Sequence, residues 1–296
     1  MLGKEKRVVA LGYFDSVHIG HVAVLSKAKQ TAEQLRAKTL VFTFDDGLKK
    51  ILGFSNTDNV YTKSERENIY KSLGMDEVFF APIDKEFLGL DKKQFLDYLN
   101  ENFEIVAYVC GEDYRFGKGG QGDVQYLKEY ARERSQQVVI APVVLVNGEK
   151  VSSTLVKQLL IDGKIAEANS VLCKKYSVTG VVFEDRKVGR SIGFPTVNIK
   201  AEKNKQQLKS GVYAGSVQID GKDYRAIINY GARPTFNLEE KLIEAHIIDF
   251  NGNLYGKQLT LYFDSFMREI KKFESTEQLI YQLKMDSLAV KEGKYD

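Results

Sequence analysis

The chain has 296 residues, of which 43% are hydrophobic and 28% charged, as expected for a soluble globular protein. At roughly 150 residues per domain, this length predicts two domains. The 43 basic and 40 acidic residues give a net charge of +3, too balanced to indicate a nucleic-acid or membrane surface. Cys110 and Cys173 form no Cys-x-x-Cys pair, which argues against a zinc site and a disulfide framework. We find no signal peptide and no run of about 18 apolar residues, and therefore expect a cytoplasmic protein.

The first half of the chain alternates strand and helix patterns. Strands are expected at residues 7–11, 39–44, 77–81, 105–110 and 137–146. Helices are expected at residues 22–36, 62–73 and 91–102, after Asp123, and at 154–160 and 165–172. Thr62 with Glu65, and Asp91 with Gln94, are expected to cap their helices. This alternation predicts a doubly wound α/β domain with a parallel sheet over residues 1–172.

The second half changes to consecutive strand patterns. Strands are expected at residues 176–183, 212–219, 224–230, 242–250 and 258–263, with one helix at 276–290. Asp220-Gly221 and Asn251-Gly252 are expected to form hairpin turns, because type I′ turns need two residues with positive φ. This pattern predicts a small antiparallel β-barrel with a C-terminal helix over residues 173–296.

The segment from Gly12 to His21 joins the first predicted strand to the first predicted helix. In open α/β sheets ligands bind at the carboxyl ends of strands, and the free N–H groups of a helix N-terminus suit phosphate. His18 and His21 flank Gly20, a spacing that can aim both imidazoles into one pocket. Considered without the rest of the motif, the two histidines could also cap the helix or pack in the core.

The His-x-Gly-His pattern at this position resembles the nucleotidylyltransferase superfamily. That superfamily pairs it with a Ser-Ser-Thr-x-x-Arg element late in the same domain. Here Ser152, Ser153, Thr154 and Lys157 occupy that place, at the start of a predicted helix. The resemblance implies that these hydroxyls bind the ATP phosphates, that Lys157 steadies the leaving pyrophosphate, and that the two histidines donate to phosphate oxygens.

Residues 110–118 resemble the Gly-x-Asp-Phe-Arg-Phe-Gly-Lys stretch of prokaryotic FAD synthases. The resemblance implies adenylyl transfer from ATP to FMN with Mg2+, giving FAD and pyrophosphate. It assigns flavin binding to Asp113, Arg115 and Phe116. It assigns nucleotide binding to Gly12, Phe14, Asp15 and Gly20, with Asp15 orienting the loop.

Three features of this half depart from the family pattern. Tyr13 and Ser16 replace an Asn and a Gly of the first motif. Residues 45–47 lack the His and the prolines that follow the family's second strand. Lys157 replaces an Arg. The two-point contact that an arginine guanidinium makes with phosphate is thereby exchanged for the single compact charge of a lysine ammonium. We expect these differences to affect rate and affinity more than reaction class.

Residues 189–198 resemble the Gly-Arg-x-Ile-Gly-Phe-Pro-Thr-Ala-Asn motif of riboflavin kinases. Thr196 and Asn198 lie two residues apart, so on a strand their oxygens face the same way, and oxygen ligands suit Mg2+. The resemblance places both beside Mg2+ and the ATP phosphates. It assigns nucleotide binding to Gly189, Arg190, Gly193 and Pro195.

Four further segments of this half resemble riboflavin kinases, at residues 229–235, 243–250, 254–256 and 266–268. The resemblance implies that Glu244 is the general base, taking the proton from the ribityl 5′-hydroxyl of riboflavin as FMN forms. It assigns flavin binding to Asn229, Arg233 and Arg268. His246 shares a strand face with Glu244, and we expect it to be paired or half-exposed rather than catalytic.

The loop from Phe183 to Arg190 lacks the His-Gly pair of riboflavin kinases and carries Glu184 and Asp185, whose charges oppose phosphate binding. The leading interpretation is a bifunctional enzyme that converts riboflavin to FMN and FMN to FAD. One alternative is an FMN adenylyltransferase whose barrel only binds flavin. A regulator that responds to flavin or nucleotide, and a transferase with another acceptor, are the others. The sequence indicates no oligomeric state and no protein partner.

Overall fold

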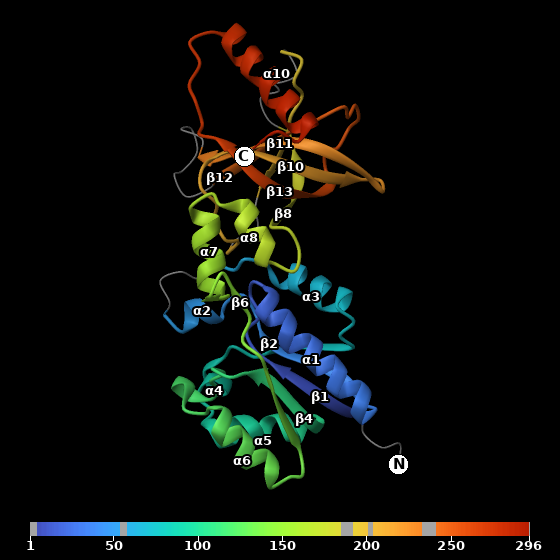
Figure 1. Ribbon diagram of the computed structural model, residues 1–296, viewed down its shortest axis with the longest axis vertical. Helices are drawn as coiled ribbons and strands as arrows, with labels where there is room; N and C mark the ends of the chain where they lie inside the picture. The colour runs from blue at the N-terminus through green and yellow to red at the C-terminus, as the bar shows by residue number, and fades with distance from the viewer. Residues whose placement is uncertain (1–4, 54–57, 185–191, 201–203, 233–240, 296) are drawn as a thin grey trace. The chain divides into compact units, whose positions relative to one another are not determined.

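The computed structural model describes residues 5–53, 58–184, 192–200, 204–232 and 241–295, apart from the side chains of residues 232 and 241. Contacts divide the chain into two compact units, Met1–Ser153 and Thr154–Asp296. Figure 1 shows the elements of both units along the chain. The two short helices α7 (Ser153–Ile161) and α8 (Ile165–Val171) fall with the second unit, apart from Ser153 itself.

A five-stranded parallel sheet forms the centre of the first unit. Its order is β3-β2-β1-β4-β5. The strands are β1 (Lys6–Leu11), β2 (Lys38–Phe44), β3 (Glu77–Ala81), β4 (Glu104–Gly111) and β5 (Gln137–Ala141). Because β1 is central and the order reverses beside it, the loop after β1 lies where ligands bind in such sheets. The predicted α/β fold is confirmed.

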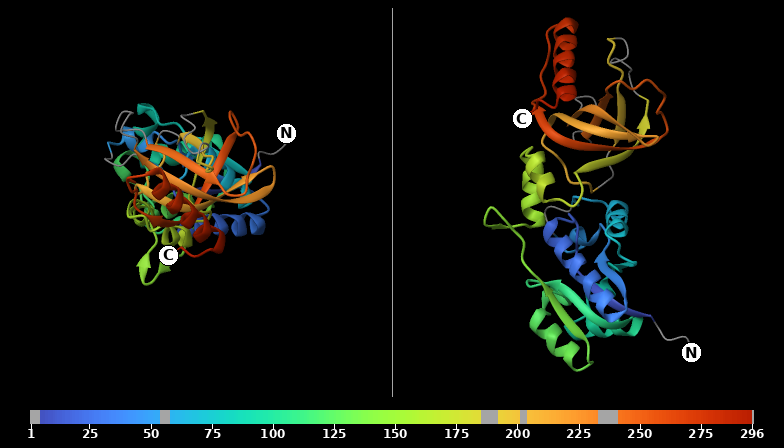
Figure 2. Two further views of the ribbon diagram at one scale, coloured as in Figure 1. Left: turned by 90° about the horizontal axis from the view of Figure 1, so that it is seen from above. Right: turned by 45° about the vertical axis from the view of Figure 1, so that its right-hand side comes forward.

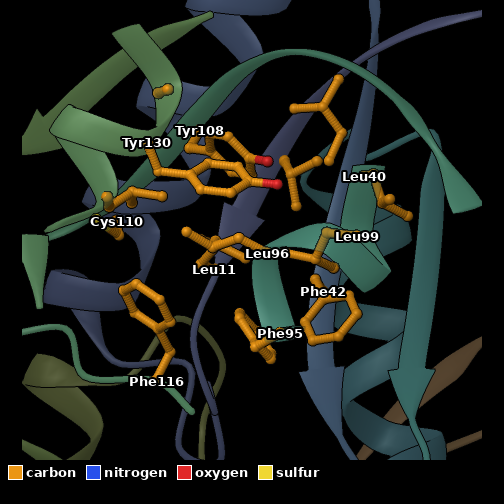
Figure 3. Packing of buried hydrophobic residues seen from close by; sticks show 14 of the residues in the cluster. Leu11, Leu40, Phe42, Phe95, Leu96, Leu99, Tyr108, Cys110, Phe116 and Tyr130 are labelled. Atoms are coloured by element: carbon orange, nitrogen blue, oxygen red, sulfur yellow. The ribbon is translucent and has the colours of Figure 1, made fainter. Parts of the chain in front are cut away.

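Helices cover both faces of this sheet. Leu11 of β1 packs in a core with Phe95 and Leu96 of α5 (Lys92–Asn102), as Figure 3 shows. Val9 of β1 belongs to the same core. This core also takes in residues of α4 (Lys85–Leu88) and α6 (Val124–Arg132). Helix α1 (Ile19–Leu35) packs against β1 and β4 but contributes nothing to that cluster, so it covers the opposite face.

The capping motifs expected from the sequence are confirmed. Thr62 and Glu65 form a capping box at the start of α3 (Lys63–Ser72), and Asp91 and Gln94 do so at α5. Asp123 caps α6 through the backbone N–H of Tyr126. Among the described residues, three short helical elements were not expected, namely α2 (Leu48–Ile51), α4 and the 3-10 turn η1 (Lys118–Gly120).

The second unit is a closed six-stranded barrel with the order β10-β11-β12-β9-β8-β13. Its strands are β8 (Ser177–Phe183), β9 (Val197–Lys200), β10 (Gly211–Ile219), β11 (Lys222–Ala232), β12 (Lys241–Ile247) and β13 (Gln258–Arg268). Helix α10 (Thr276–Glu292) lies against β11, outside the barrel (Figure 2). The predicted barrel with a C-terminal helix is confirmed. No helix among the described residues combines the length and apolarity that crossing a membrane requires.

Two local expectations are wrong. The strand expected at residues 137–146 ends at Ala141, because Pro142 has no N–H to continue the ladder, and a small hairpin of β6 (Leu145–Val146) and β7 (Glu149–Lys150) follows. Asn251-Gly252 is not a hairpin turn, because β12 and β13 are separated by β9 and β8 in the barrel. Asp220-Gly221 does join β10 to β11 with positive φ at both residues, as expected.

Candidate functional site

The loop between β1 and α1 has an unusual backbone conformation. Phe14 and Val17 have φ values of 50° and 37°, a region that non-glycine residues seldom occupy. The Phe14 ring folds back under Gly12, where a Cβ atom would lie 2.6 Å from it. A side chain at position 12 would therefore displace Phe14, which is buried. Such strain is common where a loop is held in place for function.

His18 and His21 stack on each other at the N-terminus of α1. Their ring centroids lie 3.7 Å apart, and Phe14 contacts His21 edge to face. His18 caps α1, because its Nδ1 accepts the backbone N–H of His21 at 3.2 Å. Nδ1 of neutral His18 therefore carries no proton, which leaves Nε2–H as a donor. A Cβ atom on Gly20 would lie 2.9 Å from the His18 ring, so glycine permits this arrangement.

Both imidazoles are neutral near pH 7. Burial lowers the pKa of His18 to about 4, and the nearby Asp15 carboxylate offsets this only in part. Burial and the adjacent His18 lower the pKa of His21 to about 3. Nδ1 of His21 is buried and has no hydrogen-bond partner among the described residues. The pair therefore offers neutral imidazole groups next to the free N–H groups of a helix N-terminus.

Hydrogen bonds from hydroxyl groups connect the loop of residues 12–21 to Ser153 of the Ser-Ser-Thr element. Ser153 donates to Oδ1 of Asp15 and shares a 2.9 Å hydrogen bond with Ser16. Ser16, one of the departures from the family pattern, thus makes a contact that a glycine cannot make. Asp15 is 2% exposed, so this contact is shielded from water. Ser153 thus lies beside the loop of the histidines, while Thr154 and buried Lys157 belong to the second unit.

The other carboxylate oxygen of Asp15 is bound by Lys49 of α2. The Lys49 ammonium lies 2.5 Å from Oδ2 of Asp15 and 3.2 Å from Oδ1 of Asn59. Tyr13 donates its hydroxyl to the same Asn59 oxygen at 2.9 Å, and the Lys49 nitrogen lies 4.8 Å from the centre of the Tyr13 ring. Tyr13, a second departure from the family pattern, is therefore part of the arrangement that holds Lys49.

A buried arginine connects the same loop to the end of β2. Arg66 has no exposed surface and contacts Asp46 at 2.7 Å. It also donates to the carbonyl oxygens of Tyr13 at 3.1 Å and Phe44 at 3.0 Å. Asp46 stands where the family pattern has a proline, and its carboxylate pairs with Arg66.

The three residues assigned to flavin in the first unit lie in different environments. Asp113 is exposed and pairs with Lys150 of β7 at 2.6 Å. Arg115 is exposed and lies 3.6 Å from Asp123. Phe116 is buried in the core under the loop, where it packs against Phe95.

In the second unit, three neighbouring strands bring polar side chains into one row. Asn229 of β11 lies opposite Glu244 of β12, and Glu244 lies opposite Asn198 of β9. Thr196 donates to Glu244 Oε1 at 2.7 Å. Oδ1 of Asn198 and Oδ1 of Asn229 are buried and have no hydrogen-bond partner among the described residues. Oxygen atoms of this kind are the ligands that a hard cation prefers.

His246 holds the chain segment that precedes Thr196. Its Nδ1 lies 2.8 Å from the carbonyl oxygen of Pro195, which can only accept, so Nδ1 carries the proton. Phe194 contacts the same ring edge to face. His246 is therefore paired, as the sequence analysis expected.

The remaining assigned residues that the structure describes include Arg268 and Gly193. Arg268 is bound through its guanidinium to Asp286 of α10, at distances of 2.7 to 3.2 Å. Gly193 lies in a turn with φ of 82°. Gly189, Arg190 and Arg233 fall outside the described residues.

Sequence reasoning did not identify Lys49, Asn59, Arg66 or Lys150. Lys49, Asn59 and Arg66 lie in or after the segment that departs from the family pattern, so no motif marked them. The sequence signal for a cation here was the acidic pair Asp45-Asp46, which Arg66 does contact at Asp46.

Comparison with known proteins identifies relatives of both units. Residues 2–155 match the family described as FAD synthetase, and residues 172–293 match riboflavin kinase. A bifunctional riboflavin kinase/FMN adenylyltransferase of Listeria monocytogenes is 34% identical over 95% of this chain and 90% of its own length. The protein of the same description from Bacillus subtilis is 30% identical over 96% of this chain and 91% of its own. A crystal structure described as a macrolide-efflux protein from Streptococcus pneumoniae has a TM-score of 0.90 and 31% identity, covering 97% of this chain and 94% of its own.

Proposed function

Because this chain belongs to the family of bifunctional riboflavin kinase/FMN adenylyltransferases, we propose that it phosphorylates riboflavin to FMN and adenylylates FMN to FAD. ATP is the co-substrate of both reactions, and residues 1–172 and 173–296 are the two functional domains. We place the activity in the cytoplasm, in keeping with its use of ATP. The observation that carries the first reaction is the stacked histidine pair at the start of α1, joined through Asp15 to the second motif.

In the first reaction, a phosphate oxygen of FMN attacks the α-phosphorus of ATP and pyrophosphate leaves. His18 donates through Nε2–H to a phosphate oxygen as negative charge builds up, and His21 stands beside it. The N–H groups of α1 support the same phosphates. Gly12 and Gly20 allow the loop to adopt its conformation, and Phe14 supports it from beneath. No covalent intermediate is needed, since positioning and charge stabilisation supply the acceleration.

The second motif completes the nucleotide site in this proposal. Ser153 already contacts Asp15, which supports a place for Ser152 and Thr154 beside the triphosphate. Lys157 lies on the helix that begins at Ser153, and we assign it to the leaving pyrophosphate. Mg2+ bound to the triphosphate would neutralise part of its charge.

In the second reaction, Glu244 takes the proton of the ribityl 5′-hydroxyl as that oxygen attacks the γ-phosphorus of ATP, and ADP leaves as the bond to the β–γ bridging oxygen breaks. The hydrogen bond from Thr196 fixes the position of the Glu244 carboxylate. Thr196 and Asn198 would hold Mg2+, and the buried unpaired oxygen of Asn198 supports this assignment. Mg2+ there would offset the phosphate charge near Glu244.

The remaining residues assigned from the family pattern are part of the same proposal. Asp113 and Arg115 are exposed enough to meet FMN, and Phe116 supports their loop from the core. Asn229 lies beside Glu244 and can reach a bound flavin or phosphate. Gly189, Arg190, Gly193 and Pro195 are assigned to ATP, and Arg233 and Arg268 to flavin.

A product assay of the purified chain tests both reactions. The protein is incubated with ATP and Mg2+ together with either riboflavin or FMN, and the flavins are separated by chromatography. We expect FAD from FMN, and both FMN and FAD from riboflavin. FAD from FMN with no product from riboflavin would instead select the monofunctional adenylyltransferase. No product from either flavin would reject the enzyme proposal.

Two variants assign the reactions to their sites. His21→Ala should lose FAD formation and keep riboflavin phosphorylation, and Glu244→Ala should do the reverse. We expect each loss to be about a hundredfold or more, as is usual when a group acting in the transition state is removed. Equal loss of both activities in either variant would contradict the assignment.

A further inference from the structure

We propose that His246 is a positioning residue of the riboflavin kinase site, because its ring fixes the chain segment that presents the Thr196 hydroxyl to Glu244. This inference rests on the proposed function of the second unit and adds to it a residue that the proposed reaction does not use. His246 lies on β12, two residues after Glu244, so the two side chains project from the same face of the barrel wall.

The pairing between β12 and β9 ends just before this segment. Ala245 lies opposite Val197, which is the first residue of β9. Thr196 and Pro195 precede that strand and have no ladder partner on β12. Pro195 has no N–H group, so it cannot donate a hydrogen bond that would extend the ladder. Backbone pairing with β12 therefore does not reach Thr196.

A side-chain contact from His246 holds the segment where the ladder has ended. Nδ1 of His246 lies 2.8 Å from the carbonyl oxygen of Pro195 and donates its proton to it. The Phe194 ring meets the imidazole edge to face, with ring centroids 5.2 Å apart. The backbone of His246 is itself fixed in the barrel, since it pairs with Ile227 of β11. His246 therefore connects residues 194–196 to a strand that is held on its other side.

The position of this segment determines where the Thr196 hydroxyl lies. Thr196 directly follows Pro195 and donates to Oε1 of Glu244 at 2.7 Å. A donor and an acceptor about 3.6 Å apart no longer form a hydrogen bond, so a shift of the segment by about 1 Å would break this contact. A general base must lie within hydrogen-bonding reach of the proton that it takes, so the orientation of the carboxylate affects the rate. His246 thus acts on Glu244 through Thr196 and is not itself catalytic.

Steady-state phosphorylation of riboflavin by the full chain tests this role with three variants. His246→Phe keeps an aromatic ring against Phe194 but removes the donor. His246→Asn keeps a donor close to the place of Nδ1, and His246→Leu has nearly the shape of that asparagine without a donor. We expect kcat to fall about tenfold in His246→Phe and His246→Leu, with the KM for riboflavin unchanged, because the carboxylate is misplaced in the transition state. His246→Asn should keep most of kcat.

A double variant shows whether His246 acts through Thr196. Thr196→Val keeps nearly the same shape and removes the hydroxyl that binds Glu244. If His246 acts only by placing that hydroxyl, His246→Phe should lower kcat about tenfold in the wild-type chain but hardly at all in Thr196→Val. Losses that multiply in the double variant, or a His246→Leu enzyme as active as His246→Asn, would overturn the proposal.

An NMR measurement without substrate separates this role from the proposed function. The Thr196 methyl group is followed in a chain with labelled threonine methyls, and Thr196→Val identifies its signal. We expect the signal to shift in His246→Leu and to stay near its wild-type position in His246→Asn. The signals of Thr179 and Thr260, which bond to each other across β8 and β13, should stay unchanged and show that the barrel is folded. A Thr196 signal that is the same in all variants would reject the role of His246, whereas a wild-type chain that makes no FMN from riboflavin would reject the proposed kinase reaction.

Discussion

At the scale of single residues, the histidine pair provides a measurable signature of the site. The chain contains 3 histidines, so their ring resonances can be resolved and assigned in an NMR spectrum. We expect the signals of His18 and His21 to stay unshifted as the pH falls from 8 to about 5, because the pKa of His18 is about 4 and that of His21 about 3. Asparagine variants at each position assign the signals. Titration of both rings near pH 6.5 would show that they are not buried as described.

The same lowered pKa values predict how stability depends on pH. In the unfolded chain both histidines take up protons near their ordinary pKa of 6.5, whereas in the folded chain they resist protonation. Unfolding is therefore favoured as the pH falls from 6.5 toward 4, by roughly 1.4 kcal/mol per pH unit and per histidine. Denaturation by urea at several pH values measures this slope. His18→Asn should reduce it, and an unchanged slope would contradict the origin that we assign to it.

At the scale of elements, α10 is attached to the barrel by a buried ion pair. Arg268 of β13 binds Asp286 of α10, and their side chains are 15% and 4% exposed. Asp286→Ala would leave the guanidinium without its carboxylate, which we expect to destabilise the attachment of α10 by about 3 kcal/mol. Amide hydrogen exchange in residues 276–292, followed by mass spectrometry, should become markedly faster.

A second ion pair on the same helix supplies the control for this test. Lys291 contacts Asp249 at 2.8 Å, but both side chains are largely exposed. Lys291→Ala should therefore change exchange in α10 by less than about 1 kcal/mol. If Asp286→Ala and Lys291→Ala behave alike, the Arg268 pair is no more important to α10 than a surface contact.

Most of the elements that the sequence predicted correctly have a local signal. The alternation of strands and helices, the capping boxes at Thr62 and Asp91 and the turn at Asp220-Gly221 depend on neighbouring residues, and all are confirmed. The turn expected at Asn251-Gly252 failed because strand order in a closed barrel depends on pairing between distant segments.

For the candidate site, the sequence motifs predicted individual residues but not the contacts that hold them. The motifs placed His18, His21, Thr196 and Glu244, and the structure brings each pair together. The contacts that hold them could not be read from the motifs. Lys49 meets Asp15, and Arg66 meets the Tyr13 carbonyl, only because folding joins segments 34 and 53 residues apart.

At the scale of the whole molecule, each unit has its own core and its own row of site residues. His18, His21 and Ser153 lie in the first unit, and Thr196, Asn198 and Glu244 in the second. FMN that dissociates from the second unit could therefore bind to the first unit of any molecule. We therefore predict that a mixture of His21→Ala and Glu244→Ala chains converts riboflavin to FAD, although neither variant does so alone.

The time course of that mixture distinguishes free FMN from transfer within one chain. If FMN dissociates, FAD should appear after a lag while FMN accumulates, and the lag should shorten as the concentration of both variants rises. Added FMN should abolish the lag, because the His21→Ala chain is then no longer needed. If the mixture makes FMN but no FAD while added FMN is still converted by the Glu244→Ala chain, FMN made by the kinase stays on the chain that made it. In that case the two reactions would be coupled within one chain, although the two units have separate hydrophobic cores.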